Sequence, residues 1–272
     1  MSVDRRTDEG ILAESIRANL ARVEEGIERA CQRAGRNRST VRLLAVSKFN
    51  PPVAVQAAMQ AGLRLFGENR VQEAMGKFPS LDLSGQRPAA AIATAATVAT
   101  SGDDATGLVA SLPGVQLHLL GHLQSNKASK AVQLFDCVQS VDSPDILVEL
   151  AKQAAKAGRV LDVLLELHTG EESKSGFADE AALFEALELA GDLPSLRPRG
   201  LMTMAPFTTD QAAIQRSFAA CRLSMERAAA RFGFPDFDVL SMGMTNDFEL
   251  AIAEGASLLR IGTAIFGARQ YP

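Results

Sequence analysis

Tyrosine and cysteine are scarce in this sequence of 272 residues, which contains one tyrosine and three cysteines. Cys31, Cys137 and Cys221 are isolated and unevenly spaced, and no signal-peptide pattern opens the chain. This usage argues against a secreted domain stabilised by disulfides. It predicts a protein of the reducing cytoplasm.

Histidine is equally scarce, and neither a long apolar run nor a strong charge of one sign is present. His118 and His122 are four positions apart but not on a predicted helix, and His168 is distant in sequence, so we expect no metal site. The net charge of −4 argues against general nucleic-acid binding. The longest tract of small apolar residues, Ala89–Thr100, is too short and too rich in Ala and Thr to span a membrane.

Strand-like and helical segments alternate along most of the chain. Apolar residues from Leu12 to Cys31 recur every three or four positions, which predicts a helix over about 8–34 that ends at Gly35. The predicted strands are Val41–Val46, Leu63–Phe66, Gln116–Leu120, Cys137–Ser140, Val160–His168, Arg199–Met202, Asp238–Leu240 and Ser257–Arg260. A helix follows each strand, as a (β/α)8 barrel of the TIM type requires. The alternative is a doubly wound open sheet, which more often carries its phosphate-binding glycines after the first strand.

One stretch interrupts this alternation. Residues Pro79–Pro113 are rich in Ser, Gly, Ala, Thr and Asp and have no clear period, so we expect an inserted loop. The expected organisation is a single domain over residues 1–272, with an N-terminal helix before the barrel and this insertion at about 79–113.

The last two predicted strands each lead into a glycine-containing turn and a helix. Ser241-Met-Gly-Met-Thr245 follows the first of them, and Arg260-Ile-Gly-Thr263 includes the end of the second. Glycine lets the backbone approach a ligand, and the first amides of a helix attract negative charge. In barrels of this kind, phosphate often binds between the loops after strands seven and eight, so these turns predict a phosphate site.

Lys48 follows the first strand, at the end of a barrel where reactive groups lie. A lysine with a phosphate site is the pattern of pyridoxal phosphate binding, and equally of a Schiff-base aldolase. Arg260 is placed to meet a phosphate or a pyridine nitrogen. Asn69, in the turn after the second strand, is a further candidate for ligand contact. The residues alone leave both chemistries open.

Several motifs, taken together and in order, resemble one family. They are Lys48, Gly67-Glu-Asn-Arg-Val-Gln-Glu73, His118-Leu-Leu-Gly-His-Leu-Gln-Ser-Asn-Lys127, Glu172-Ser-Lys-Ser-Gly176, Gly200-Leu-Met-Thr-Met204 and the two C-terminal turns. The chain resembles the pyridoxal phosphate homeostasis proteins (the YggS/PROSC family), which have the fold of the alanine racemase N-terminal domain.

The resemblance implies that pyridoxal phosphate is the cofactor, held as a Schiff base on Lys48. It implies phosphate contacts from Ser241, Gly262 and Thr263 with Met242 alongside, Arg260 at the ring nitrogen, and Asn69 beside the cofactor. It also implies a carrier without established catalysis that serves vitamin B6 and amino-acid homeostasis, with pyridoxal phosphate-dependent apoenzymes as candidate partners. We expect this carrier to be a monomer. No catalytic residue and no metal are expected.

The rival function is that of a pyridoxal phosphate-dependent amino-acid racemase or lyase. Racemases of the alanine type use a tyrosine from a second domain, whereas Tyr271 is the only tyrosine here and lies beside the last residue. The sequence also departs from the family pattern. The insertion is long, Leu117 stands where an aromatic residue is frequent, and Thr245 and Asn246 replace a frequent Ser and Asp. None of these departures changes Lys48 or Arg260.

Overall fold

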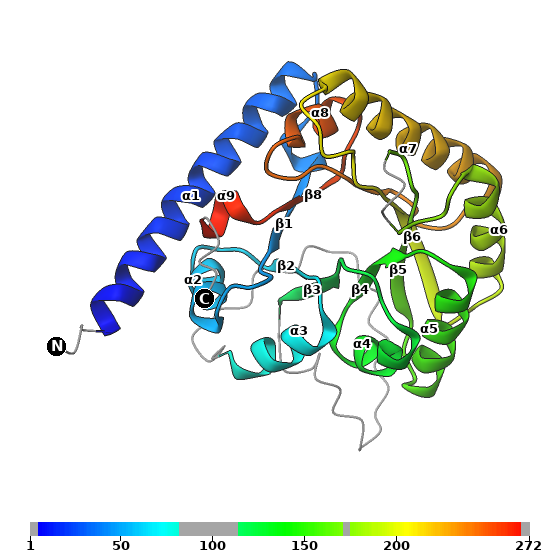
Figure 1. The fold of residues 1–272 in the computed structure, drawn as a ribbon, viewed down its shortest axis with the longest axis horizontal. Coiled ribbons are helices and arrows are strands. Elements are labelled where there is room, and N and C mark those ends of the chain that lie inside the picture. Colours follow the sequence, from blue (N-terminus) through cyan, green and yellow to red (C-terminus); the bar gives the residue numbers. More distant parts are fainter. Residues whose placement is uncertain (1–4, 82–113, 171–174, 268–272) are drawn as a thin grey trace.

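The computed structural model describes residues 5–81, 114–170 and 175–267 (Figure 1). Eight parallel strands pair in chain order, and the last strand pairs with the first, so the sheet closes into a barrel. The strands are β1 Arg42–Val46, β2 Leu65–Glu68, β3 Gln116–Leu119, β4 Cys137–Val141, β5 Leu161–Glu166, β6 Leu196–Met202, β7 Val239–Ser241 and β8 Leu258–Ile261. The predicted TIM-type barrel is confirmed.

A helix follows each strand, and one long helix precedes the barrel. The α-helices are α1 Arg5–Arg33, α2 Pro52–Gln60, α3 Val71–Lys77, α4 Ala128–Leu134, α5 Pro144–Lys156, α6 Glu180–Gly191, α7 Gln211–Phe232, α8 Phe248–Ala253 and α9 Thr263–Phe266. Short 3-10 helices are η1 Arg38–Thr40, η2 Phe78–Ser80 and η4 Ser125–Lys127. Within the described ranges, no helix combines the length and apolar content that crossing a membrane requires.

The N-terminal helix packs on the outside of the barrel. α1 contacts α2, α8 and α9, and it crosses the outer side of the barrel in Figure 1. Its apolar stripe explains this position, because Ile16, Val23 and Ile27 are buried. The helix ends as expected: Gly35 has a left-handed φ of +63°, and the N–H of the next residue, Arg36, donates to the carbonyl of Cys31.

The second strand lies two residues later than predicted. Leu63 belongs to the end of α2, because its N–H donates to the carbonyl of Ala58 across Gly62, whose φ is +104°. This helix-ending motif uses the residue that the sequence pattern assigned to the strand. Gly67 and Glu68, expected in a turn, therefore complete β2. Gly67 lies where a Cβ would come within 2.4 Å of Leu44 Cδ2, so a side chain there would require Leu44 to move.

The structure describes only the first three residues of the expected insertion at about 79–113. Pro79 and Ser80 belong to η2, and Leu81 after it is buried. Residues 82–113 lie outside the described ranges. The expectation that residues 1–272 form a single domain therefore stays a prediction.

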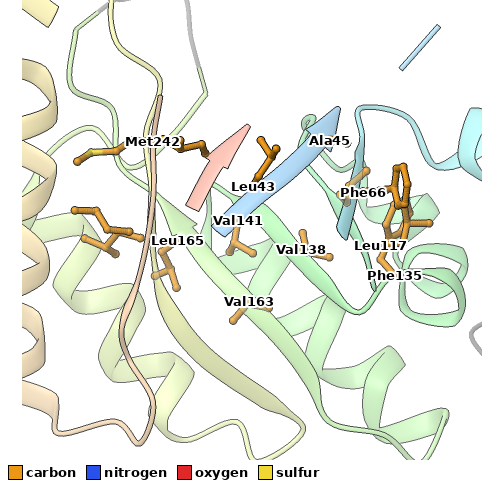
Figure 2. Packing of buried hydrophobic residues seen from close by; sticks show 14 of the residues in the cluster. Leu43, Ala45, Phe66, Leu117, Phe135, Val138, Val141, Val163, Leu165 and Met242 are labelled. Carbon is orange, nitrogen blue, oxygen red and sulfur yellow. The ribbon is translucent and has the colours of Figure 1, made fainter. Parts of the chain in front are cut away.

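Side chains alternate across each strand, so the barrel has an inner and an outer set of buried residues. Leu43 and Ala45 of β1 join the large core between strands and helices, together with residues such as Phe66 and Val163 (Figure 2). Leu44 and Val46 belong instead to a separate cluster that includes Met202 and Leu258, which the alternation places inside the barrel. Leu44 and Val46 thus lie on the inner face of β1, and Val46 is at the carboxyl end of the strand, where the barrel mouth lies.

Candidate functional site

A cavity of about 1080 Å³ lies among the loops that follow the strands. Its wall includes residues from the loops that follow six of the eight strands: Lys48, Asn69, Leu120, Met204, Thr245 and Gly262. The carboxyl ends of the strands are the catalytic or binding face of barrels of this type. The cavity therefore lies where the sequence predicts a ligand site.

Five of the seven predicted cofactor residues line this cavity, namely Lys48, Asn69, Arg260, Gly262 and Thr263. Ser241 and Met242 do not, and both are fully buried. Met242 packs in the core between strands and helices (Figure 2). The place of Met242 beside the cofactor stays a prediction, and the burial of its side chain in this core does not support it.

Lys48 lies in a tight turn directly after β1. It is two residues beyond Val46 on the inner face of the strand, and both residues line the cavity. The turn closes where the N–H of Asn50 donates to the carbonyl of Ser47 at 3.0 Å. Phe49 at its third position has φ +64°, a left-handed conformation usually left to Gly or Asn. The lysine therefore sits in a strained, closed turn at the edge of the cavity.

Two other lysines in motif-bearing loops could compete with Lys48 as the reactive amine. Lys127, at the end of η4, does not line the cavity. Lys174 lies outside the described residues. Lys48 is the lysine that the structure places in the cavity wall.

The turn after β8 brings backbone close to the cavity. Gly262 lies where a Cβ would be 3.0 Å from the carbonyl oxygen of Val46, so glycine permits close packing of β8 on β1. Thr263 follows as the first residue of α9. The first N–H groups of a helix have no acceptor within it, so this turn has the donors that an anion needs.

Arg260 is on the inner face of β8 and is only 5% exposed. Its Nη1 donates to Ser241 Oγ at 2.7 Å, and its Nη2 donates to the carbonyl of Thr203 at 2.8 Å. Burial lowers the pKa of Arg260, and the nearby carboxylate of Glu166 opposes that shift. An arginine keeps its proton under such conditions, so the guanidinium is a fixed cation beside the cavity.

A chain of hydrogen bonds crosses the barrel from Arg260. Ser241 Oγ, which accepts from Arg260, donates to Gln139 Oε1 at 2.6 Å. Gln139 Nε2 lies 2.7 Å from His118 Nδ1. Burial lowers the pKa of His118 to about 3, so its ring is neutral and Nδ1 accepts from the amide. The chain therefore runs in one direction, from the permanent donor on β8 to the acceptor on β3.

Sequence reasoning did not find this chain, nor several residues of the cavity wall. Gln139 was assigned only to a strand, and His118 was considered only as a strand residue, a motif residue and a metal ligand. The wall also contains Met202, Met204 and the highly exposed Phe207. The period-two pattern of the strands was the available signal, because alternation points every second residue into the barrel.

One glycine of the predicted motifs has a local role at the cavity. Gly121 lies where a Cβ would be 2.3 Å from the carbonyl oxygen of Asn69, so the loops after β2 and β3 touch there. A larger residue would push the Asn69 backbone and displace a residue of the cavity wall.

A second group of ionisable side chains lies near Arg260. Glu166, at the end of β5, is 2% exposed and accepts a hydrogen bond from Ser175 at 3.2 Å. Burial raises its pKa to about 7, although Ser175 and Arg260 favour the ionised form. His122 Nδ1 lies 2.6 Å from Asp142 Oδ2.

None of the three histidines lines the cavity. Within the described residues, no group of three or more His, Cys, Asp or Glu side chains could hold a metal ion.

Comparison with known proteins relates the chain to one family. The family model "Alanine racemase, N-terminal domain" matches residues 18–270. The pyridoxal phosphate homeostasis protein of Pseudomonas aeruginosa is 41% identical over 260 residues, which cover 94% of this chain and 97% of that protein.

Two solved structures share the fold. PipY of Synechococcus elongatus, solved with pyridoxal phosphate (PLP) bound, is 34% identical with a TM-score of 0.71, covering 93% of this chain and 100% of that chain. Alanine racemase of Streptomyces coelicolor is 22% identical with a TM-score of 0.62, covering 94% of this chain and 58% of that one. The second similarity shows the barrel fold alone.

Proposed function

Because the chain belongs to the family of pyridoxal phosphate homeostasis proteins, which have the alanine racemase N-terminal domain, we propose that it binds pyridoxal phosphate in the barrel mouth and serves the homeostasis of that cofactor. One observation carries this proposal. An amine on Lys48, a buried cation on Arg260 and the turn Gly262–Thr263 all line one cavity.

The chemistry of these residues fits the parts of the cofactor. Lys48 supplies a primary amine for an aldehyde, and Arg260 supplies a fixed donor for a ring nitrogen. Gly262 and Thr263 supply backbone and hydroxyl donors for a phosphate. Asn69 offers an amide in the loop after β2, the strand that pairs with β1. In this proposal Ser241 acts through Arg260, whose guanidinium it holds.

The site favours holding the cofactor over catalysis. When bound, pyridoxal phosphate supplies an electrophilic aldehyde and an electron-withdrawing ring. Arg260 cannot accept a proton, so it would leave the ring nitrogen unprotonated and the ring a weaker electron sink.

A second base for proton transfer is also missing among the described residues of the cavity wall, which include no His, Cys, Tyr or Glu. The one carboxylate there, Asp247, accepts the N–H of Met244 at 2.5 Å. We therefore propose a carrier without turnover of its own, and not a racemase or lyase.

The wider role follows the same proposal. We propose that the protein acts as a monomer in the cytoplasm and that apoenzymes that require pyridoxal phosphate are its partners. The three cysteines support a reducing compartment, because all are buried as free thiols.

The proposal is tested by borohydride reduction of the cofactor-loaded protein, followed by peptide mapping. We expect the adduct on Lys48, and we expect Lys48→Ala to remove both the adduct and the visible absorbance band. Lys127→Ala is the matched control, because that lysine lies in a motif loop away from the cavity wall, and it should keep both signals. An adduct on Lys127 or Lys174 would show that the reactive amine is misassigned.

A further inference from the structure

A buried group of charges lies behind the turn that carries Lys48. Lys77, on α3, donates from Nζ to Glu68 Oε1 at 2.6 Å, to Glu73 Oε1 at 2.9 Å and to the carbonyl of Ser47 at 2.8 Å. Glu68 is fully buried, Lys77 nearly so, and Glu73 partly. Three acceptors surround the Lys77 amine, and Lys77 does not line the cavity, so it is no rival to Lys48 as a nucleophile.

Each member of this group also contacts the Lys48 turn. Ser47 Oγ donates to Glu68 Oε1 at 2.7 Å, while the Ser47 carbonyl accepts from Lys77. On the other side of the lysine, the N–H of Phe49 donates to Glu73 Oε1 at 2.5 Å. The residues before and after Lys48 are therefore both tied to the same group of charges.

The turn needs such support because its conformation is unfavourable. Phe49 has φ +64°, and a residue with a side chain pays for this conformation in steric strain. Strained residues persist where their surroundings over-determine them. The guanidinium of Arg70 lies 5.9 Å from the centre of the Phe49 ring and adds a contact from the side-chain end.

The group is itself expensive to bury. Charges removed from water cost several kcal/mol each unless their pairing is good. Among the described residues, Glu68 Oε2 is buried without a hydrogen-bond partner, and burial raises the pKa of Glu68 against the opposing effect of Lys77. An apolar contact between α3 and β2 would serve packing alone at lower cost.

We propose that Glu68, Glu73 and Lys77 are positioning residues that hold the turn of residues 47–50 so that the Lys48 amine faces the cavity. This inference rests on the proposed function, in which Lys48 is the amine that joins the cofactor aldehyde. A turn that is already held in the bonding geometry reduces the conformational entropy that Lys48 loses when it bonds to the aldehyde.

The test compares two ligands that differ at the aldehyde. Pyridoxal phosphate bonds to the lysine, whereas pyridoxine 5′-phosphate has an alcohol in place of the aldehyde and binds without a covalent bond. Glu73→Ala removes the acceptor of the Phe49 N–H and should weaken pyridoxal phosphate binding about tenfold, as expected for one charge-assisted hydrogen bond. Pyridoxine 5′-phosphate binding should change less than about twofold, because its contacts do not involve the amine.

Two further variants complete the design. Glu73→Gln keeps an oxygen acceptor for the Phe49 N–H, so we expect it to stay within about threefold of the unmodified protein for both ligands. Glu180→Ala is the matched control, since it removes a surface ion pair with Arg227 on the far helices α6 and α7. Thermal unfolding of each variant identifies any loss of fold.

Each outcome is decisive. Selective weakening of pyridoxal phosphate by Glu73→Ala, with rescue by Glu73→Gln, supports the positioning role. Equal weakening of both ligands, no weakening, or failure of Glu73→Gln to restore binding overturns it. If Glu73→Ala does not fold, Glu73→Ser takes its place in the comparison of the two ligands. Glu73→Gln remains the rescue variant, and the same criteria apply. Failure of the proposed function is a separate result, because the unmodified protein would then form no adduct on Lys48.

Discussion

Arg260 Nη1, in the cavity wall, donates a hydrogen bond at 2.7 Å to Ser241 Oγ, which lies inside the barrel and does not line the cavity. The same oxygen donates its own proton to Gln139. The hydroxyl that the sequence assigned to a phosphate is thus fully engaged within the protein. Ser241 would therefore affect ligand binding indirectly, by holding the guanidinium of Arg260 in position.

This arrangement predicts how Ser241→Ala changes ligand binding. Loss of one bond to a charged group costs about 1.5–3 kcal/mol, so we expect about tenfold weaker binding of pyridoxal phosphate. Pyridoxal without its phosphate should weaken by a similar factor, since the ring contact is affected. Thr263→Val, at the cavity wall, should weaken only the phosphorylated ligand. Absorbance titrations measure the binding of both ligands. If Ser241→Ala weakened only pyridoxal phosphate, the result would support a direct contact between Ser241 and the phosphate.

Burial of Glu166 predicts that the free energy of unfolding depends on pH. The pKa of Glu166 rises from 4.5 to about 7 on folding, because burial disfavours its charge. Its stabilising contribution is fully present below about pH 4.5 and is lost as pH rises through about 7. The difference corresponds to about 3 kcal/mol as an upper bound. Glu166→Gln should therefore raise the free energy of unfolding at pH 8 and change it little at pH 4.5, as chemical denaturation can measure. An equal change at both pH values would contradict burial as the cause.

His118 predicts the opposite dependence. Its folded pKa of about 3 lies below the usual 6.5, so its contribution is present above pH 6.5 and is lost as pH falls toward 3. Between pH 7.5 and 5 we expect a neutral ring that carries its proton on Nε2, because Nδ1 accepts from Gln139. Nitrogen-detected NMR of the imidazoles measures both properties. A ring that gains a proton above pH 6 would show that the hydrogen-bond chain is broken or reversed.

Most of the fold could be predicted because each element has a local signal. Ser143 and Pro144 mark the start of α5, because the Ser143 side chain accepts from the N–H of Ile146 and proline suits the first position of a helix. The predicted start of β2 was wrong because Leu63 fits two sequence patterns equally well, that of a strand and that of a helix end. Only the φ of Gly62, which the sequence does not reveal, decides between them.

The site was less predictable than the fold. Lys48 and Arg260 were found because they stand at strand ends, and strand ends are visible in the sequence. The partners of Ser241 were not, since which residues face one another across a barrel depends on the register of all eight strands. The pairing of Glu68 with Lys77 was missed for a related reason: two charges nine positions apart look like ordinary surface residues until α3 folds back on β2.

Gly200 predicts a large loss of stability from a small change. Its φ is +146°, and an added Cβ would lie 1.9 Å from the carbonyl oxygen of Val239. Gly200→Ala should destabilise the protein by about 3 kcal/mol or more, because strain and a backbone clash coincide. Gly10→Ala is the control, since Gly10 lies in α1 with open space around it, and should stabilise by about 0.5–1 kcal/mol. Urea unfolding of both variants measures the difference, and similar effects would contradict the geometry at Gly200.

The proposed lack of turnover predicts the behaviour of amino acids at the site. The described cavity wall offers no second base, and Tyr271 lies outside the described residues. We expect the cofactor-loaded protein to exchange the Cα hydrogen of L-alanine, L-serine or L-lysine no faster than free pyridoxal phosphate does in deuterated water. Exchange at about 1 s⁻¹ or faster is typical of enzymes. Such a rate, measured by NMR, would overturn the carrier and favour the racemase or lyase.

Closure of the barrel by β8 against β1 also decides when the site can exist during protein synthesis. The ribosome makes Lys48 with the first strand and Arg260 with the last, and these strands are neighbours only in the closed sheet. A nascent chain that has emerged as far as β7 has the amine without the arginine or the turn Gly262–Thr263. The proposed site can therefore form only after β8 has been made and has closed the sheet against β1, so we expect binding of the cofactor to follow that step of synthesis.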